Sequence, residues 1–260
     1  LNKDNINLTN NIELEKLISI TGVGEVKAND LFNKKITLDI LLKEYTKYED
    51  NIEDSKILIN LTHHQIVGLK YYYDLKLLIP RQEIDKIQKK IKRNINNIDK
   101  SLEVIVCGSY RREKEKSGDI DILILHKKLI TGEDIEKQNI EYLKLIVETL
   151  KYKNILVDNL TDGGNTKYMG VCKLVSRSKG RRIDIRFIPY ISKASALLYF
   201  TGSGNFNKIM RLGAKKKGYL INEYGLYKIN KPENILIETL TEEDIFKELK
   251  MEYLEPKNRI

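Results

Sequence analysis

The chain of 260 residues is 41% hydrophobic and 32% charged, a composition that is typical of a folded globular protein and excludes an intrinsically disordered one. Its 46 Lys and Arg residues against 37 Asp and Glu residues give a net charge of +9, which favours polyanionic partners such as nucleic acid. No apolar stretch approaches the roughly 20 residues that cross a bilayer, so we expect no membrane partner, and two cysteines with three histidines predict neither a disulfide scaffold nor a zinc site.

Helical periodicity marks the first third of the chain. Hydrophobic residues recur at helical spacing over 12–18, and two further helices are predicted from about Glu25 and over 38–42. Pro80 breaks the pattern because proline does not continue a helix, and isoleucines at helical spacing then predict a helix over 82–98. We therefore expect a helical region over residues 1–84.

The rest of the chain combines short apolar segments with helices. Segments rich in Ile, Leu and Val predict strands over 102–107, 120–125, 168–174 and 182–188, and a helix is predicted over 135–152. After Pro189 the predicted elements are helices over 193–200 and 205–217, a β-hairpin over 219–229 and a helix over 242–249. This order predicts an α+β protein in which regions 85–190 and 191–260 follow the helical one.

Three aspartates lie on or beside predicted strands. Asp119 and Asp121 are two residues apart, so their side chains point to one face, and Asp184 is a polar residue within a second apolar strand. Neighbouring carboxylates repel each other unless cations lie between them, and Mg²⁺ prefers a few carboxylates together with substrate phosphates. Three such carboxylates on neighbouring strands would hold two metals that align an attacking hydroxyl with a leaving pyrophosphate; on the acids alone, the alternative of solvated acids at strand ends is favoured.

A glycine and a serine precede the acidic pair. Gly108 and Ser109 follow a predicted strand and come just before Arg111 and Arg112. Small residues let backbone N–H groups approach a phosphate, the serine adds a hydroxyl and Arg112 adds a charged fork. A Gly-Ser pair ahead of Asp-x-Asp is the arrangement of nucleotidyltransferases, and we favour this interpretation over an ordinary glycine turn.

Two further segments suit nucleic acid. The stretch from Ile20 to Gly24 places two glycines between predicted helices and resembles a helix-hairpin-helix, whose backbone amides can face a DNA phosphate; the alternative is a plain turn. A run of cations on the helix predicted over 205–217 suits phosphates, and the alternative is a solvated helix face. These cations are Lys208, Arg211, Lys215, Lys216 and Lys217.

The segment 106–126, VCGSYRREKEKSGDIDILILH, resembles the palm motif of the family X DNA polymerases. The resemblance extends over the chain from about residue 12, through THHQIVGLKYY (62–72), TKYMGVCKL (166–174), RRIDIRFIP (181–189), LLYFTGSGNFNKIMR (197–211), INEYGL (221–226) and EPKNR (255–259). It implies a DNA-binding helix-hairpin-helix subdomain at 1–84, a nucleotidyltransferase palm with a mixed β-sheet at 85–190, and a small α/β subdomain for the nucleotide and nascent base pair at 191–260.

The resemblance implies cofactors and their ligands. Asp119, Asp121 and Asp184 would be the catalytic acids and would hold two Mg²⁺ ions, for which Mn²⁺ can substitute, and Asp184 would assist deprotonation of the primer 3′-hydroxyl. A monovalent cation, Na⁺ or K⁺, would bind at the helix-hairpin-helix. Its ligands would be the backbone carbonyls of Ile18, Ile20 and Val23.

Substrate contacts also follow from the resemblance. Residues implied to hold the incoming nucleotide are Gly108, Ser109, Arg112, Gly118, Tyr199, Phe200, Gly202 and Asn207. Residues implied to contact DNA are Gly22, Gly24, Lys167, Arg182, Lys208, Arg211 and Tyr224. Arg186 would act as a conformational switch that pairs with Asp121 in an open state and with the region of Glu223 in a closed state.

The chain departs from the family pattern in three places. It holds no counterpart of the amino-terminal lyase domain of the beta-type enzymes, so we expect no lyase activity unless an upstream segment supplies it. Leu77 and Leu78 stand where those enzymes have basic residues, which leaves open whether Arg81 replaces a triphosphate contact. Gly204 stands where an acidic side chain usually packs against the incoming base.

The resemblance implies a template-directed DNA polymerase that fills short gaps in DNA repair, such as base excision repair. Its partners would be gapped or primer-template DNA and deoxynucleoside triphosphates, and we expect a monomer. Alternatives are a template-independent terminal nucleotidyltransferase, disfavoured by the short segment 175–180, and a catalytically silent DNA-end-binding scaffold, disfavoured by the intact acids. We expect an intracellular protein, nuclear if cellular and cytoplasmic or virion-associated if viral.

Overall fold

The computed structural model describes residues 3–138, 140–161 and 164–260 and divides into two compact units. The first unit contains the chain up to Leu77 together with Asp158–Thr161, and the second contains the remainder. Within the described residues, no helix is both long enough and apolar enough to cross a membrane.

The first unit is helical. Its elements are α1 (Lys3–Ile18), α2 (Glu25–Asn33), α3 (Leu38–Tyr48), η1 (Ile52–Asp54), η2 (Leu58–Asn60), α4 (His63–Lys70) and α5 (Tyr72–Leu75). Thr37 caps α3, and Thr62 with Gln65 forms a capping box at α4, which satisfies amide groups that a helix start leaves unpaired. The buried side chains of Leu17, Leu31 and Leu41 lie in one core, so the helices of this unit bury a common apolar face.

The palm part of the second unit is built on a five-stranded sheet in the order β2-β4-β7-β6-β5. The strands are β2 (Leu102–Val106), β4 (Ile120–His126), β5 (Leu156–Asn159), β6 (Lys167–Cys172) and β7 (Arg181–Phe187). β4 pairs with β7 in parallel, whereas β2–β4 and β6–β7 are antiparallel, so the sheet is mixed. Short β1 (Ile79–Pro80) and β3 (Lys116–Ser117) form a separate two-stranded pair.

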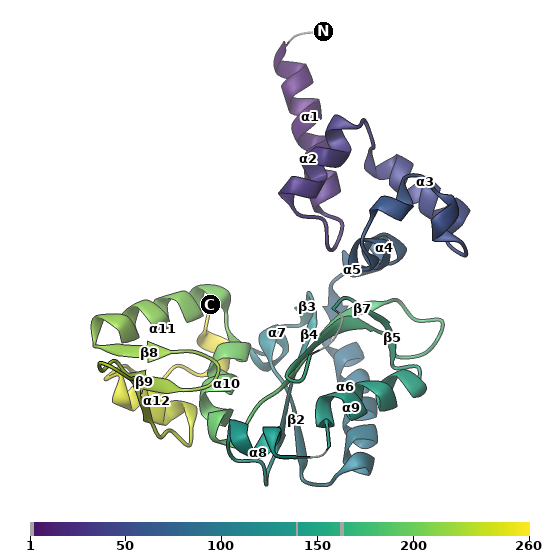
Figure 1. Ribbon diagram of the computed structural model, residues 1–260. Helices are drawn as coiled ribbons and strands as arrows, with labels where there is room; N and C mark the ends of the chain where they lie inside the picture. The colour runs from purple at the N-terminus through teal and green to yellow at the C-terminus, as the bar shows by residue number, and fades with distance from the viewer. Residues whose placement is uncertain (1–2, 139, 162–163) are drawn as a thin grey trace. The chain divides into compact units, whose positions relative to one another are not determined.

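Two helices pack on the palm sheet. α6 (Arg81–Ile98) and α9 (Tyr142–Tyr152) contact each other and the sheet, and Figure 1 shows them side by side. The isoleucines at helical spacing, Ile84, Ile87 and Ile91, are buried in the core, as the sequence pattern predicts. The helix predicted over 135–152 is instead α8 (Gly132–Glu136) and α9, because a capping box of Thr131 and Asp134 starts a short separate helix. Residue 139 of that prediction lies outside the described residues.

The C-terminal part of the second unit combines helices with a small sheet. Its elements are η3 (Tyr190–Ser192), α10 (Lys193–Thr201), α11 (Gly204–Lys216), β8 (Tyr219–Ile221), β9 (Leu226–Lys228), β10 (Ile235–Ile237), α12 (Glu242–Glu248) and η4 (Pro256–Asn258). The three strands are antiparallel in the order β10-β9-β8, and α11 packs along β8 (Figure 1). The predicted α+β class, with a mixed palm sheet and a small α/β C-terminal part, is confirmed.

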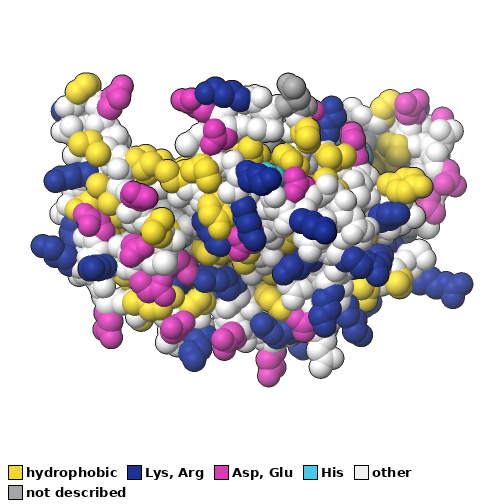
Figure 2. All heavy atoms as spheres, turned by 90° about the horizontal axis from the view of Figure 1, so that it is seen from below, with side chains coloured by type: hydrophobic (Ala, Val, Ile, Leu, Met, Phe, Trp, Pro, Cys, Tyr) yellow, Lys and Arg dark blue, Asp and Glu magenta, His cyan; other side chains and the backbone are white. Residues whose placement is uncertain are grey.

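One face of the molecule shows how its charged residues are mixed. On the face shown in Figure 2, Lys and Arg side chains are interspersed with Asp and Glu and with exposed hydrophobic side chains. The net charge of +9 on this protein therefore acts on a polyanion as a general attraction, and local specificity must come from particular sites.

Candidate active site

The central feature of the palm is a pair of carboxylates on adjacent parallel strands. Asp121 of β4 lies in register with Asp184 of β7, so both side chains leave the same face of the sheet. They line one pocket together with Arg186 and Phe200. The predicted alternation of apolar residues on these two strands thus places both aspartates at one site.

This pair lies in an environment that disfavours negative charge. Burial, followed by the charges of Asp119 and Asp184, raises the pKa of Asp121 to about 7. Burial also raises the pKa of Asp184, against the opposing effect of the Arg182 guanidinium. Among the described residues, Asp184 Oδ1 has no hydrogen-bond partner although it is buried. Two partly buried carboxylates, one with a buried unpaired oxygen, are a donor set that fits a divalent cation.

Asp119 lies near the other two carboxylates, but its own carboxylate pairs with an arginine. It lies just before β4, and its Oδ2 accepts a hydrogen bond from the Arg182 guanidinium of β7. Within the described ranges, no three His, Cys, Asp or Glu side chains are grouped so as to hold a metal ion. The structure therefore brings Asp121 and Asp184 together and directs Asp119 to an arginine, so the three-carboxylate metal site stays a prediction.

A one-turn helix, α7 (Gly108–Arg111), lies beside Asp121 and carries the predicted phosphate-binding residues. Gly108 has φ +57°, and a Cβ at this position would clash with Asp121 Oδ2. Glycine is required here because any side chain would meet the carboxylate in a strained backbone conformation. Gly118 is exposed, and no atom lies within 4 Å of a would-be Cβ there.

Two arginines connect this turn to the C-terminal part. Arg112 donates to the carbonyl oxygen of Thr201 at the end of α10, and burial lowers its pKa. Arg111 donates to both carboxylate oxygens of Glu242, at 3.0 and 2.6 Å. Arg259, whose side chain is 0% exposed, donates to the same carboxylate at 2.6 Å.

The sequence analysis missed Glu242 and Arg259 as partners of the Gly108–Arg111 turn. The segment EPKNR at 255–259 matched the family pattern without indicating a contact. A buried carboxylate shared by two guanidinium groups links residues that are 131 positions apart, and no local pattern reveals such a pairing.

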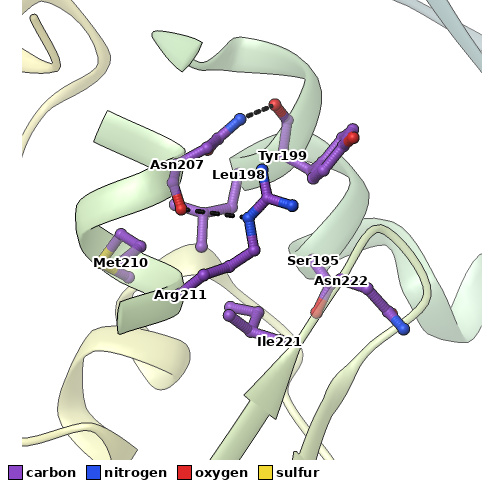
Figure 3. Close-up of a pocket in the computed structure, with 8 residues that line it drawn as sticks. All are labelled: Ser195, Leu198, Tyr199, Asn207, Met210, Arg211, Ile221 and Asn222. Carbon is purple, nitrogen blue, oxygen red and sulfur yellow. Dashed lines mark hydrogen bonds between the residues drawn. The ribbon is translucent and has the colours of Figure 1, made fainter. Parts of the chain in front are cut away.

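Residues predicted to face the nucleotide and template gather between α10 and α11. Asn207 Nδ2 donates to the carbonyl oxygen of Tyr199 at 2.7 Å, and Arg211 Nε donates to that of Asn207 at 3.3 Å (Figure 3). The Arg211 guanidinium lies 5.6 Å from the centre of the Tyr199 ring. These three side chains form one cluster, and Lys208 is exposed on the same helix.

The aromatic pair of α10 links this cluster to the acidic pocket. Tyr199 and Phe200 meet edge to face at 5.1 Å, and Phe200 lies under the guanidinium of Arg186 at 5.4 Å. Gly202 follows with φ +66°, a conformation that favours glycine. The predicted nucleotide contacts Tyr199, Phe200 and Gly202 are therefore adjacent to the Asp121–Asp184 pocket.

Arg186 pairs with neither of its predicted partners. Within the described residues it forms no ion pair with Asp121 or with Glu223, which lies between β8 and β9 beside the half-exposed Tyr224. Its Nε is buried without a hydrogen-bond partner there. Lys167 of β6 lies in register with Arg186. Burial raises the pKa of Asp184, and the charges of Lys167 and Arg186 offset part of that rise. The switch therefore stays a prediction.

The hairpin of the first unit is closely packed at Gly22 and open at Gly24. Gly22 has φ +88°, its carbonyl oxygen accepts from Gln65 Nε2 at 3.1 Å, and a Cβ would lie 2.9 Å from the His64 ring. The Ile20 carbonyl accepts the Val23 amide at 3.0 Å, and that of Gly24 accepts the Ala28 amide. Gly68, which the sequence analysis did not single out, leaves no room for a side chain against the Thr21 carbonyl.

Comparison with known proteins agrees with this fold. A family model described as the DNA polymerase beta palm matches residues 78–190, and one described as the DNA polymerase beta thumb matches residues 196–260. The fold and site therefore define a nucleotidyltransferase palm joined to a polymerase thumb. The chain belongs to the family X DNA polymerases, which confirms the resemblance seen in the sequence.

Curated relatives support the same assignment. The chain is 34% identical to DNA polymerase lambda of Rattus norvegicus over 222 residues, covering 80% of this chain and 38% of the relative. It is 31% identical to DNA polymerase lambda of Arabidopsis thaliana over 235 residues, covering 84% and 43%. DNA nucleotidylexotransferase of Xenopus laevis is 29% identical over 238 residues, covering 81% and 46%. The chain spans less than half the length of these relatives.

Proposed function

We propose that the chain is the polymerase core of a family X enzyme that adds deoxynucleotides to a primer 3′ end on a DNA template. The observation that carries the proposal is the in-register pair Asp121 and Asp184, which faces a pocket beside the Gly108–Arg111 turn. Membership of family X gives this geometry its context, and relatives named DNA polymerase lambda favour templated synthesis.

Asp121 and Asp184 would hold the divalent cations, with Asp119 completing the set once it leaves Arg182. When bound, such ions would lower the pKa of the primer 3′-hydroxyl and offset charge on the departing pyrophosphate. Asp184 would accept the proton of that hydroxyl. Ser109 and Arg112 would orient the triphosphate, so that catalysis rests on positioning and electrostatics rather than on a covalent intermediate.

The groups around this centre would fix the substrates. Tyr199, Phe200 and Gly202 would pack against the sugar, and Asn207 would contact the base. DNA near the primer end and the template would be contacted by Arg182, Lys167, Lys208, Arg211 and Tyr224. Gly22 and Gly24 would present amides to a phosphate, with a monovalent cation at the carbonyls of Ile18, Ile20 and Val23. We further propose short-gap filling in DNA repair by an intracellular monomer.

A template-independent terminal transferase is the second candidate, because one relative is named DNA nucleotidylexotransferase. The connection between β6, which ends at Cys172, and β7, which begins at Arg181, is short, and this favours templated synthesis.

The test measures incorporation with Mg²⁺ on three substrates: a one-nucleotide gap, an open primer-template and a single-stranded primer. We expect template-matched addition on the first two and little on the third. An Asp184→Asn variant serves as the inactive control. Equal extension of the single-stranded primer would favour the terminal transferase, and no addition on any substrate would refute the proposal.

A further inference from the structure

Tyr110, which lies between Ser109 and Arg111 in the nucleotide-binding turn, is anchored to helix α6 at its hydroxyl. The phenol donates to Asp85 Oδ1 at 2.5 Å and accepts from Gln88 Nε2 at 2.7 Å. Burial, followed by the hydrogen bond to Asp85, raises the pKa of Tyr110, so the phenol remains a protonated donor at neutral pH.

Arg81, at the start of the same helix, holds the other end of this residue. Its guanidinium lies 4.0 Å from the centre of the Tyr110 ring, and Nη1 donates to the Tyr110 carbonyl oxygen at 2.6 Å. The first two turns of α6 therefore fix the ring, the hydroxyl and the backbone of a single residue. Arg81 is therefore engaged with Tyr110 through both its ring contact and its hydrogen bond.

Helix α6 is a rigid anchor for this contact. It runs for 18 residues, and Ile84, Ile87 and Ile91 on its inner face are fully buried in the palm core. By contrast, α7 has only four residues, too few for a helix to hold its own position. The location of Ser109 and Arg112 is thus set by what the neighbouring residues Tyr110 and Arg111 contact.

The opposite side of the turn is tied to the C-terminal part. Arg111 and Arg112 bind Glu242 and Thr201, which belong to α12 and α10. The Asp85–Tyr110–Gln88 contacts, called here the Tyr110 clamp, are the counterpart on the palm side. Losing the clamp would leave the turn attached to the thumb and held on the palm side only by Arg81 and by the Cys107 amide, which donates to the Asp121 carbonyl oxygen at 2.8 Å.

We propose that Tyr110 and Asp85 are positioning residues that hold the Ser109–Arg112 turn at the phosphate-binding distance from the catalytic carboxylates. The inference rests on the proposed function and says which residues hold the nucleotide site of the proposed polymerase in place. The hydrogen bond from Tyr110 to the Asp85 carboxylate is partly buried, and we expect the loss of this positioning contact to weaken nucleotide binding about three- to tenfold. The turn would contact phosphates in both ground and transition states, so the effect falls on KM rather than on kcat.

The test compares the parent chain with Tyr110→Phe and Asp85→Ala. Tyr142→Phe is the matched control, because the Tyr142 hydroxyl also donates to an aspartate of the palm, Asp99, at 2.9 Å. Binding of dCTP with Mg²⁺ is measured by equilibrium dialysis, incorporation is measured on a one-nucleotide gap, and the melting temperature of each variant is recorded. We expect Tyr110→Phe and Asp85→Ala to raise both the Kd for dCTP and the KM about three- to tenfold, with kcat within about twofold of the parent.

The control should match the parent in Kd and KM. The clamp is refuted if Tyr110→Phe binds dCTP like the parent, or if it lowers kcat and the melting temperature while Kd and KM stay unchanged. A parent chain that binds dCTP without incorporating it would refute the proposed polymerase function, and the dialysis result would then decide the clamp alone. A parent chain that binds no dCTP would refute the clamp.

Discussion

Replacing Glu242 by alanine should destabilise the second unit strongly. This carboxylate is 5% exposed and accepts from Arg111 at 3.0 and 2.6 Å and from Arg259 at 2.6 Å. Arg111 is partly exposed and can turn to water, whereas Arg259 is fully buried and lies against the rings of Phe206, Phe246 and Tyr253. Removing one partner of a buried ion pair while the other keeps its charge lowers the free energy of unfolding by about 3–5 kcal/mol. We expect the lower end of this range because only Arg259 would be left as a buried charge without its carboxylate partner.

The assay is urea unfolding followed by circular dichroism, together with the melting temperature. A loss of about 3 kcal/mol corresponds to a fall of roughly 6–12 °C for a unit of this size. Glu133→Ala is the control, since its pair with Lys137 is exposed at the surface and worth under about 0.5 kcal/mol. The double variant Glu242→Gln with Arg259→Met should recover most of the loss, because no buried charge remains unpaired. A Glu242→Ala protein within about 1 kcal/mol of the parent, or a double variant no better than the single one, would refute the reasoning.

Three further outcomes follow from the geometry. Asp184→Asn should abolish incorporation yet melt at an equal or higher temperature in metal-free buffer, because it removes one of two repelling carboxylates; a clearly lower melting temperature would contradict this. Gly68→Ala should destabilise the first unit by about 1–3 kcal/mol because its methyl group meets the Thr21 carbonyl, whereas Gly24→Ala, which has open space, should match the parent in stability. The pKa of Asp99 is held below its ordinary value, first by the Ser101 amide and then by His126. The ionised Asp99 therefore stabilises the folded protein at pH values above the pKa that it has in the unfolded chain, and this stabilisation is lost as the pH falls through its pKa in the folded protein. Asp99→Asn should therefore cost about 1 kcal/mol at neutral pH, and the difference from the parent should shrink in acid titrations of stability; a constant difference would exclude this origin.

The elements that position the site were predictable because their patterns are local. The apolar strands predicted over 120–125 and 182–188 are β4 (Ile120–His126) and β7 (Arg181–Phe187), and the helix predicted over 82–98 is α6. Strands β5 and β10 were missed, since both are short and β10 exposes much of Ile235 and Leu236. The first helix begins at Lys3, whereas the sequence analysis placed its start near residue 12. The prediction started too late because the segment before residue 12 is polar and carries no clear hydrophobic period.

Pairings between distant side chains were beyond the sequence. The Asp-x-Asp spacing predicts two carboxylates on one face, but whether Asp119 turns to Arg182 or to Asp121 depends on which strand lies next to β4. The Tyr110 clamp likewise depends on where α6 packs, which a helical period does not specify. Physical contact across the fold, rather than propensity, decides these details.

The parallel pairing of β4 with β7 has a consequence for the order of folding. Antiparallel partners such as β6 and β7 are joined by a short connection and can form early, whereas β7 reaches β4 only after α8, α9, β5 and β6 have been placed between them. Closing so long a segment is entropically costly and slow. We therefore expect Asp121 and Asp184 to meet late in folding, so that the site for a divalent ion is completed only after the antiparallel strand pairs have formed.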